Sequence, residues 1–138
     1  MGIQLESICS ETFARFGSVI EFPVDFEENF CIIETDEKNP WRVAVFRYDN
    51  KEIQTIECHP TSKETFEPLE GVTILLVAEH ERPEEYRAFL LDKPVCLHKG
   101  VWHQTLAVTK QASVKITENL EVESVFYELK KPVSVYVG

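Results

Sequence analysis

Acidic side chains and a histidine lie close together in one stretch of the chain, residues 57–71. Glu57 and His59 are separated by one residue. Because a β-strand turns successive side chains to opposite faces, both should point to the same side. Glu64 follows five residues after His59 on a predicted return strand, and Gly71 ends the segment in a turn. A carboxylate and an imidazole therefore share one surface of the predicted sheet.

A second polar island interrupts an apolar run at residues 94–106. It contains His98 and His103, which lie on either side of Gly100. Both stretches place polar groups inside otherwise apolar sequence. We expect them to form one site.

The two stretches together supply nitrogen and oxygen ligands: His59, His103, Glu57 and Glu64. Such a mixed set suits nickel, zinc, manganese or iron(II) better than a soft copper site, and the ligand types alone do not choose among those metals. The alternative is that each group is a solvated or hydrogen-bonded side chain on a sheet. That alternative is preferable for any one residue alone, but four residues at this spacing favour a shared site.

Composition limits the class of protein. The chain has 138 residues, 43% of them hydrophobic and 11% aromatic, which is typical of a globular protein, and we expect one domain over residues 1–138. Its 24 acidic and 14 basic residues give a net charge of -10. Nucleic acid and anionic membranes favour a clustered basic face, so neither is an expected partner. An anionic small molecule would need a locally basic pocket.

The cysteines and the amino-terminal residues indicate the compartment. No CxxC pair or zinc-finger spacing occurs among Cys9, Cys31, Cys58 and Cys96. No secretory signal is recognisable at the start, and no apolar run approaches membrane-spanning length. We therefore expect free thiols in a reducing, cytoplasmic environment.

The hydrophobic pattern predicts a mainly all-β protein with a short amino-terminal helix over 10–17. Ser10 is the expected N-cap and Gly17 the expected end of that helix. Residues 23–40 are acidic and predict a loop or an edge strand. The predicted strands are 18–22, 42–48, 53–59, 65–67, 72–78, 87–91, 101–108, 114–117, 123–129 and 133–137. Many short strands at regular spacing favour a sandwich or barrel, and a jelly roll is the simplest choice.

Both polar stretches resemble the two signatures of the cupins. The first signature is matched by Glu57, His59, Glu64 and Gly71, with glutamate in place of the first histidine. The second is matched at His98, Gly100, His103 and Ala107, with proline and asparagine replaced. The order and internal spacing agree, so the resemblance implies a cupin-type jelly-roll barrel.

Within the cupins, the sequence resembles the ureidoglycolate lyase family, also called ureidoglycolate hydrolases. The stretches that carry this resemblance span most of the chain: 16–21, 56–60, 65–69, 87–89, 98–103 and 121–124. The resemblance implies a cytosolic homodimeric enzyme of allantoin breakdown that cleaves ureidoglycolate to glyoxylate and urea. It also implies a divalent metal, which is nickel for the family.

The chain departs from that family's pattern at three places. Residues 22–41 lack the pattern of the amino-terminal ligand-contacting region, and 115–119 lack the aspartate, arginine and glycine expected there. Glu64 stands where the family tends to have glutamine. These differences keep a second hypothesis open: a divergent small cupin, with or without a metal, that binds or transforms another small carboxylate or sugar ligand.

The resemblance also suggests roles for the polar residues. Ureidoglycolate is a hemiaminal, and its cleavage needs a base for the hydroxyl proton and an acid for the departing urea nitrogen. His59, Glu64 and His103 would hold the metal or the substrate, which places both histidines in the catalytic centre. Glu57 or His98 would transfer the proton, and the sequence does not apportion the two roles.

A substrate carboxylate needs a cation. The candidates are Arg47, Arg87 and Lys99, because each lies on or beside a strand expected to line the barrel. Taken singly, each is more simply a surface charge or the partner of an acidic side chain. Arg87 and Lys99 fall within the family-like stretches, which favours them.

Apolar residues on the expected outer face of the barrel predict a homodimer. These residues are Ile56, Cys58, Val101, Val133, Val135 and Val137. Cupins commonly cover that face in a dimer.

Overall fold

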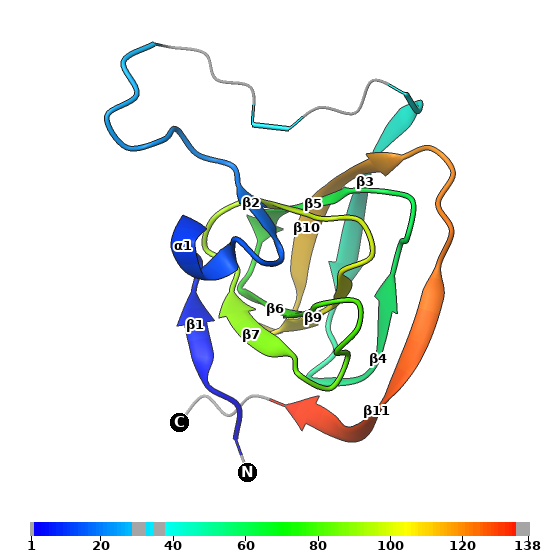
Figure 1. The fold of residues 1–138 in the computed structure, drawn as a ribbon. Helices are drawn as coiled ribbons and strands as arrows, with labels where there is room; N and C mark the ends of the chain where they lie inside the picture. The colour runs from blue at the N-terminus through cyan, green and yellow to red at the C-terminus, as the bar shows by residue number, and fades with distance from the viewer. Residues whose placement is uncertain (1, 29–32, 35–37, 135–138) are drawn as a thin grey trace.

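The computed structural model describes residues 2–28, 33–34 and 38–134, and it is nearly all β (Figure 1). The elements in chain order are β1 (Leu5–Ser7), α1 (Ser10–Phe13), β2 (Gly17–Val19), β3 (Trp41–Tyr48), β4 (Glu52–Cys58), β5 (Glu64–Glu70), β6 (Thr73–Ala78), β7 (Arg87–Leu90), β8 (Val95–Leu97), β9 (Trp102–Ala107), β10 (Ala112–Asn119) and β11 (Val125–Ser134). The mainly all-β prediction is confirmed. No helix in the described part of the chain has the length and apolar character needed to cross a membrane.

The strands form two sheets with the connectivity of a jelly roll. One sheet has the order β1-β7-β6-β9-β4-β11 and the other β2-β8-β5-β10-β3. Apart from the β6–β7 hairpin, strands β3 to β10 alternate between the sheets, so that β3-β10-β5-β8 faces β4-β9-β6-β7, which is the jelly-roll order. β1, β2 and β11 extend the edges. The jelly-roll prediction is therefore confirmed by strand order.

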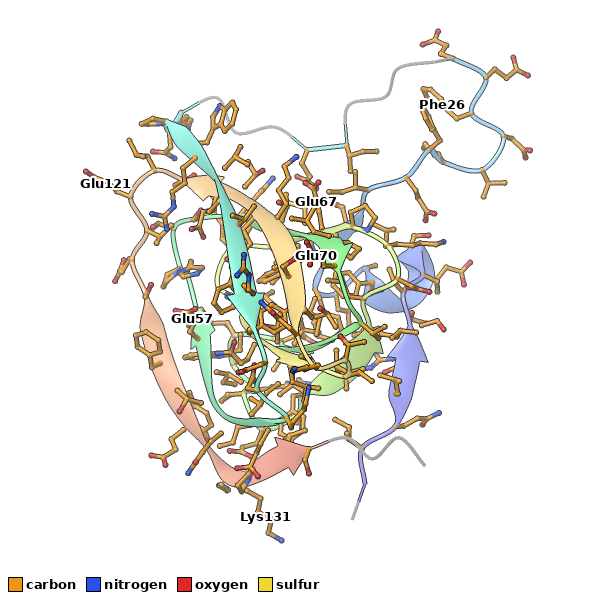
Figure 2. The ribbon with its side chains drawn as sticks, turned by 180° about the vertical axis from the view of Figure 1, so that it is seen from behind. Phe26, Glu57, Glu67, Glu70, Glu121 and Lys131 are labelled. Atoms are coloured by element: carbon orange, nitrogen blue, oxygen red, sulfur yellow. The ribbon has the colours of Figure 1, made fainter. Side chains whose placement is uncertain are left out.

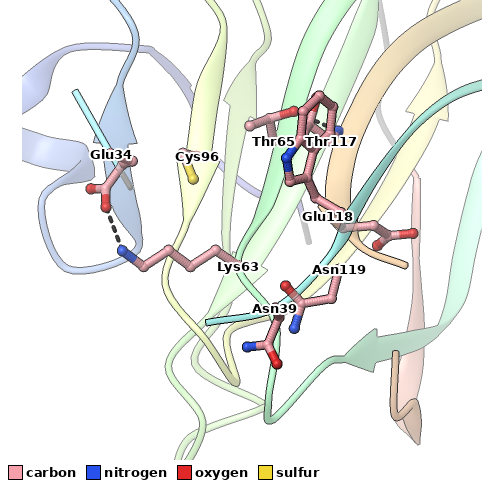
Figure 3. A pocket seen from close by; sticks show the side chains of 9 residues that line it. Glu34, Asn39, Lys63, Thr65, Cys96, Thr117, Glu118 and Asn119 are labelled. Carbon is pink, nitrogen blue, oxygen red and sulfur yellow. Dashed lines mark hydrogen bonds and ion pairs between the residues drawn. The ribbon is translucent and has the colours of Figure 1, made fainter. Parts of the chain in front are cut away.

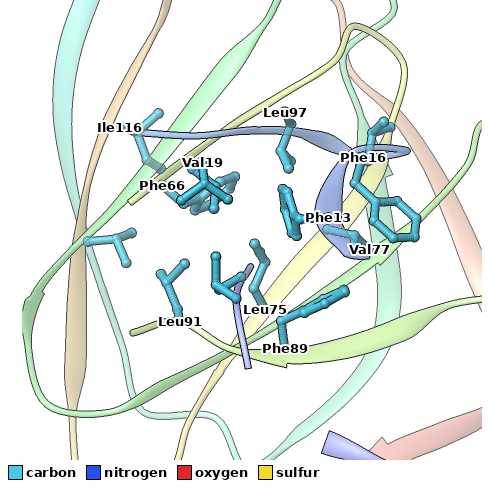
Figure 4. Packing of buried hydrophobic residues seen from close by; sticks show 14 of the residues in the cluster. Phe13, Phe16, Val19, Phe66, Leu75, Val77, Phe89, Leu91, Leu97 and Ile116 are labelled. Atoms are coloured by element: carbon cyan, nitrogen blue, oxygen red, sulfur yellow. The ribbon is translucent and has the colours of Figure 1, made fainter. Parts of the chain in front are cut away.

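Apolar side chains from the facing sides of both sheets form an inner core (Figure 4). Period-two alternation supplies them: Leu75 and Val77 on β6 point inward, as do Val114 and Ile116 on β10. Phe13 lies fully buried at the end of the sandwich that α1 closes. The core thus fixes which face of each strand is interior.

A second apolar cluster covers the face of the six-stranded sheet that points away from the inner core. It buries residues from which the dimer was predicted. All six residues of β6 are buried, as expected for a strand that is covered on both faces. Ile56, Cys58 and Val133 belong to this second cluster, and Val101 belongs to the inner core. These side chains are buried within one chain, so they offer no open apolar face. Residues 135–138 lie outside the described residues.

The amino-terminal elements differ from the sequence prediction. The helix is a single turn whose N-cap is Cys9, because the Phe13 N–H reaches the Cys9 carbonyl at 3.0 Å, and Ser10 is its first residue. Gly17 does not end the helix but begins β2. A Cβ there would lie 1.9 Å from the Cys96 carbonyl oxygen, so only glycine allows this strand to approach β8 so closely. β1 and β8 were not predicted, because three residues carry too little periodicity.

Candidate metal centre

The side chains of the two polar stretches meet between the sheets, at one end of the sandwich. Glu57 on β4 and His103 on β9 are direct register partners. His59 follows β4, and its carbonyl accepts the Gly100 N–H at 3.0 Å, which joins the two stretches. Glu64, the first residue of β5, reaches them from the other sheet. Glu57 can be located beside β4 in Figure 2. The expectation of one shared site agrees with this geometry.

Both histidines are oriented by backbone carbonyls. Nδ1 of His59 lies 3.1 Å from the Glu123 carbonyl oxygen, and Nδ1 of His103 lies 3.1 Å from that of Val101. A carbonyl only accepts, so each Nδ1 carries the hydrogen and each Nε2 is left to face the interior. Metal-ligating histidines have this arrangement, in which an outer carbonyl fixes the ring and its tautomer.

The Glu64 carboxylate lies against both imidazoles. Its Oε1 is 2.8 Å from Nε2 of His103 and 3.4 Å from Nε2 of His59. The first distance would suit a hydrogen bond, but the two atoms are not aligned for one. Glu64 Oε1 and His103 Nε2 are therefore both buried without a hydrogen-bond partner. Ligands about 2.1 Å from a metal and at right angles to each other are separated by about 3 Å. The donor atoms therefore fit a shared metal ion.

Two residues of this cluster were missed in the sequence. Glu118 on β10 is buried, and its Oε1 lies 3.8 Å from Nε2 of His59. Arg42 on β3 donates from Nε to the other oxygen, Oε2, at 2.9 Å. The predicted strand stopped at residue 117, although the inward alternation of Val114 and Ile116 continues to position 118. Extending the strand by one residue would have placed Glu118 on the inner face.

Two groups of ligand atoms satisfy the distances of a metal site. The ligand atoms of Glu57, His59 and His103 lie within 4.8 Å of one another, and so do those of His59, Glu64 and Glu118. Together with the unpartnered buried atoms, these groups show that the cluster can hold a divalent metal ion.

The buried charges shift each other's pKa. Burial by itself lowers the pKa of His59, but contact with the Glu64 carboxylate outweighs it and raises that pKa to about 9. The pKa of His103 rises for the same reasons. Burial acts to raise the pKa of Glu64, and attraction to His103 and His59 holds it below its usual range instead. Since each Nδ1 is already protonated, the added proton sits on Nε2, where a metal would bind.

The remaining carboxyl and imidazole groups have different surroundings. Burial, together with the charge of Glu64, raises the pKa of Glu118, although Arg42 opposes this. His98 is exposed, and its Nε2 donates to the Ala14 carbonyl at 3.0 Å. It lines a small cavity with His59, so it borders the cluster from the turn.

The three predicted substrate cations do not gather at the cluster. Arg47 is exposed on β3, on the outer face opposite the buried Tyr48. Arg87 on β7 donates from Nε to Glu6 at 2.7 Å, in an ion pair at the other edge of the six-stranded sheet. Lys99 is exposed in the turn before β9. Arg42 contacts the carboxylates of the cluster, through Glu118.

A larger pocket of about 260 Å³ lies on the outer face of the five-stranded sheet (Figure 3). Thr65 on β5, Cys96 on β8 and Thr117 on β10 line it, and their neighbours along each strand point into the core. An ion pair between Lys63 and Glu34 spans its edge. Glu118 also lines this pocket, so the pocket borders the candidate metal centre, whose histidines lie on the inner side of the sheet.

Comparison with known proteins identifies the family. The sequence model described as ureidoglycolate lyase matches residues 33–123 of this chain. The chain belongs to the ureidoglycolate lyase family. The matched range contains every residue of the cluster, from Arg42 to Glu118. The chain is thus a lyase-type enzyme, which confirms the resemblance.

Curated relatives carry the same description as the family model. Ureidoglycolate lyases from three strains of Pseudomonas putida are each 30% identical, over 73% of this chain and 74% of theirs. A mutant of Bacillus subtilis oxalate decarboxylase has a TM-score of 0.49 and 12% identity over 66% of this chain. This chain spans 24% of that larger one.

Proposed function

We propose that this member of the ureidoglycolate lyase family cleaves ureidoglycolate to glyoxylate and urea in allantoin breakdown, in the cytoplasm. The observation that carries the proposal is the convergence of Glu57, His59, Glu64 and His103 in one buried cluster inside a jelly roll. Four residues from three strands and a loop make this arrangement specific.

The proposed metal ligands are His59, His103 and Glu64, with Glu57 beside them. Nickel is the first candidate, and zinc, manganese and iron(II) also suit the nitrogen and oxygen donors. When bound, the ion lowers the pKa of the substrate hydroxyl and attracts the oxygens of the substrate. His59 and His103 hold their rings in place through the Glu123 and Val101 carbonyls.

Glu57 is the proposed proton carrier. It is half-buried and lies opposite His103, so it can reach both the cluster and a molecule entering from solvent. Its carboxylate takes the hydroxyl proton, a carbonyl forms at that carbon, and the carbon–nitrogen bond breaks towards urea. The same proton then passes from Glu57 to the departing nitrogen, which balances the reaction. His98 is less suited, because Ala14 engages its Nε2.

Arg42 is the proposed receptor for the substrate carboxylate. Its side chain is 43% exposed, and it touches the cluster through Oε2 of Glu118. A guanidinium that is fixed on one side and open on the other can bind a carboxylate from solvent. It replaces Arg47 and Arg87, which point elsewhere.

The decisive experiment is an assay of urea and glyoxylate release from ureidoglycolate by the purified protein. We expect equal amounts of both products with nickel added, and a loss of turnover after treatment with EDTA that added metal restores. Folding is checked by circular dichroism in each sample. Absence of both products with nickel, zinc, manganese and iron(II), from a folded protein, would contradict the proposal.

We also propose that the chain is a homodimer that buries an exposed apolar strip on β3. Trp41, Val43 and Val45 share the outer face of this edge strand and are 65%, 52% and 75% exposed. Contiguous exposed apolar groups mark interaction surfaces. Light scattering at micromolar concentration should give twice the chain mass of 16.0 kDa.

The dimer proposal has a matched pair of variants. Val45→Asp should shift the mass to that of one chain, because it buries a charge in the interface. Ser113→Asp, on the neighbouring strand β10, should remain dimeric. A wild-type mass of one chain would refute the dimer.

A further inference from the structure

Glu118 carries a carboxylate at an inward-facing position of β10, where the preceding inward-facing residues are apolar. Glu118 faces inward on β10, following Val114 and Ile116, and it is 8% exposed. Its register partner on β5 is Glu64, which is also buried. Like charges directly opposite each other on a sheet are destabilising, and burial strengthens that repulsion. His59 and His103 offset the charge of Glu64, so it is Glu118 that needs a further compensating group.

Arg42 binds only one of the two oxygens of the Glu118 carboxylate. Both Nε and Nη2 of Arg42 donate to Oε2. The other oxygen, Oε1, has no hydrogen-bond partner although it is buried, and it points towards His59. A simple structural ion pair would not require a buried, unpartnered oxygen. Arg42 instead fixes the carboxylate so that Oε1 faces the centre.

Three unpartnered buried atoms meet at this point. They are Oε1 of Glu64, Nε2 of His103 and Oε1 of Glu118, and each belongs to a side chain more than nine-tenths buried. Buried polar groups normally have hydrogen-bond partners, and leaving one without a partner is destabilising. Their convergence is typical of a cation site.

The local charge matches a divalent ion once the ion has replaced the Nε2 protons of the two imidazoles, and the Glu118–Arg42 pair leaves this balance unchanged. Glu57, Glu64 and Glu118 carry three negative charges, and Arg42 supplies one positive charge. With both imidazoles neutral, two negative charges remain. A divalent cation would neutralise them.

We infer that Glu118 is an additional ligand of the metal and that Arg42 orients it. This inference rests on the metal centre of the proposed function. A third carboxylate makes the donor set richer in oxygen, which favours six-coordinate ions over tetrahedral zinc. Loss of Glu118 should therefore weaken manganese binding more than zinc binding.

The test is isothermal titration of the metal-free protein with manganese(II) and zinc(II). Glu118→Gln keeps the shape of the side chain and removes its charge. We expect a rise in the Kd for manganese of about 10- to 100-fold, and a smaller rise for zinc. The control, Glu67→Gln, changes a carboxylate of β5 that pairs with Lys115 at 3.4 Å on the outer face. Its metal affinity should equal that of the wild type.

Thermal unfolding of the metal-free proteins separates a ligand from a structural residue. Metal-free Glu118→Gln should be at least as stable as the wild type, because the repulsion with Glu64 is removed. A lower melting temperature, or an unchanged manganese Kd, would overturn the inference. If the wild type binds neither metal, the centre itself fails and the inference fails with it; an unchanged Kd in the variant leaves the centre and the lyase proposal intact.

Discussion

Replacing His59 or His103 by alanine is expected to remove metal binding and with it the turnover of ureidoglycolate. Each ring is held by a carbonyl through Nδ1 and presents Nε2 to the shared centre. Loss of an outer partner of a metal ligand already costs 10- to 100-fold in affinity or activity, so loss of a ligand should exceed about 100-fold. Metal content after dialysis, together with product release, measures the effect.

The matched control for these variants is His80→Ala. His80 stacks on Trp102 at a centroid distance of 5.8 Å and contacts the Gly100 carbonyl, on the back of the sheet. It takes no part in the metal groups formed by the described residues. This variant should keep its metal and most of its activity. Full metal occupancy in either His59→Ala or His103→Ala would refute the ligand assignment.

Phe89→Ala is expected to produce the largest loss of stability. Phe89 on β7 is completely buried and packs edge-to-face on Phe13 and Phe16, with ring centroids 5.1 Å and 5.9 Å away. Removing such a ring leaves a cavity that costs about 3–5 kcal/mol of unfolding free energy. Phe13 is the last residue of α1 and Phe16 lies between α1 and β2, so this part of the chain should loosen as well. Urea denaturation measures the free energy of unfolding.

A surface phenylalanine provides the comparison. Phe126 on β11 is 65% exposed, and its replacement by alanine should change the unfolding free energy by no more than about 0.5 kcal/mol. Equal losses in the two variants would contradict the assignment of Phe89 to the core.

Local sequence determined much of the fold and part of the centre. Period-two alternation placed most of the strands, and positive φ at Gly71 agrees with its predicted turn. The same alternation predicted that Glu57 and His59 share a face. These properties depend on neighbours along the chain, so the sequence carries them directly.

Strand faces could not be chosen where both sides of a strand are apolar. On β3, Val43 and Val45 alternate with Phe46 and Tyr48, and the pattern alone does not say which set points inward. The structure turns Tyr48 into the core, and therefore Arg47 outward and Arg42 to the cluster side. The two arginines are five positions apart on the strand, and an odd offset places them on opposite faces.

The rest of the centre was decided only by tertiary structure. Arg42 and Glu118 are 76 residues apart, and they meet because β3 pairs with β10. Glu118 reaches His59 because the two sheets face each other across the interior. Arg87 pairs with Glu6 and not with a group of the centre, because β1 pairs with β7. The sequence determined which side chains share a strand face, whereas strand pairing and sheet packing decided which charges meet, because those contacts join positions far apart in the chain.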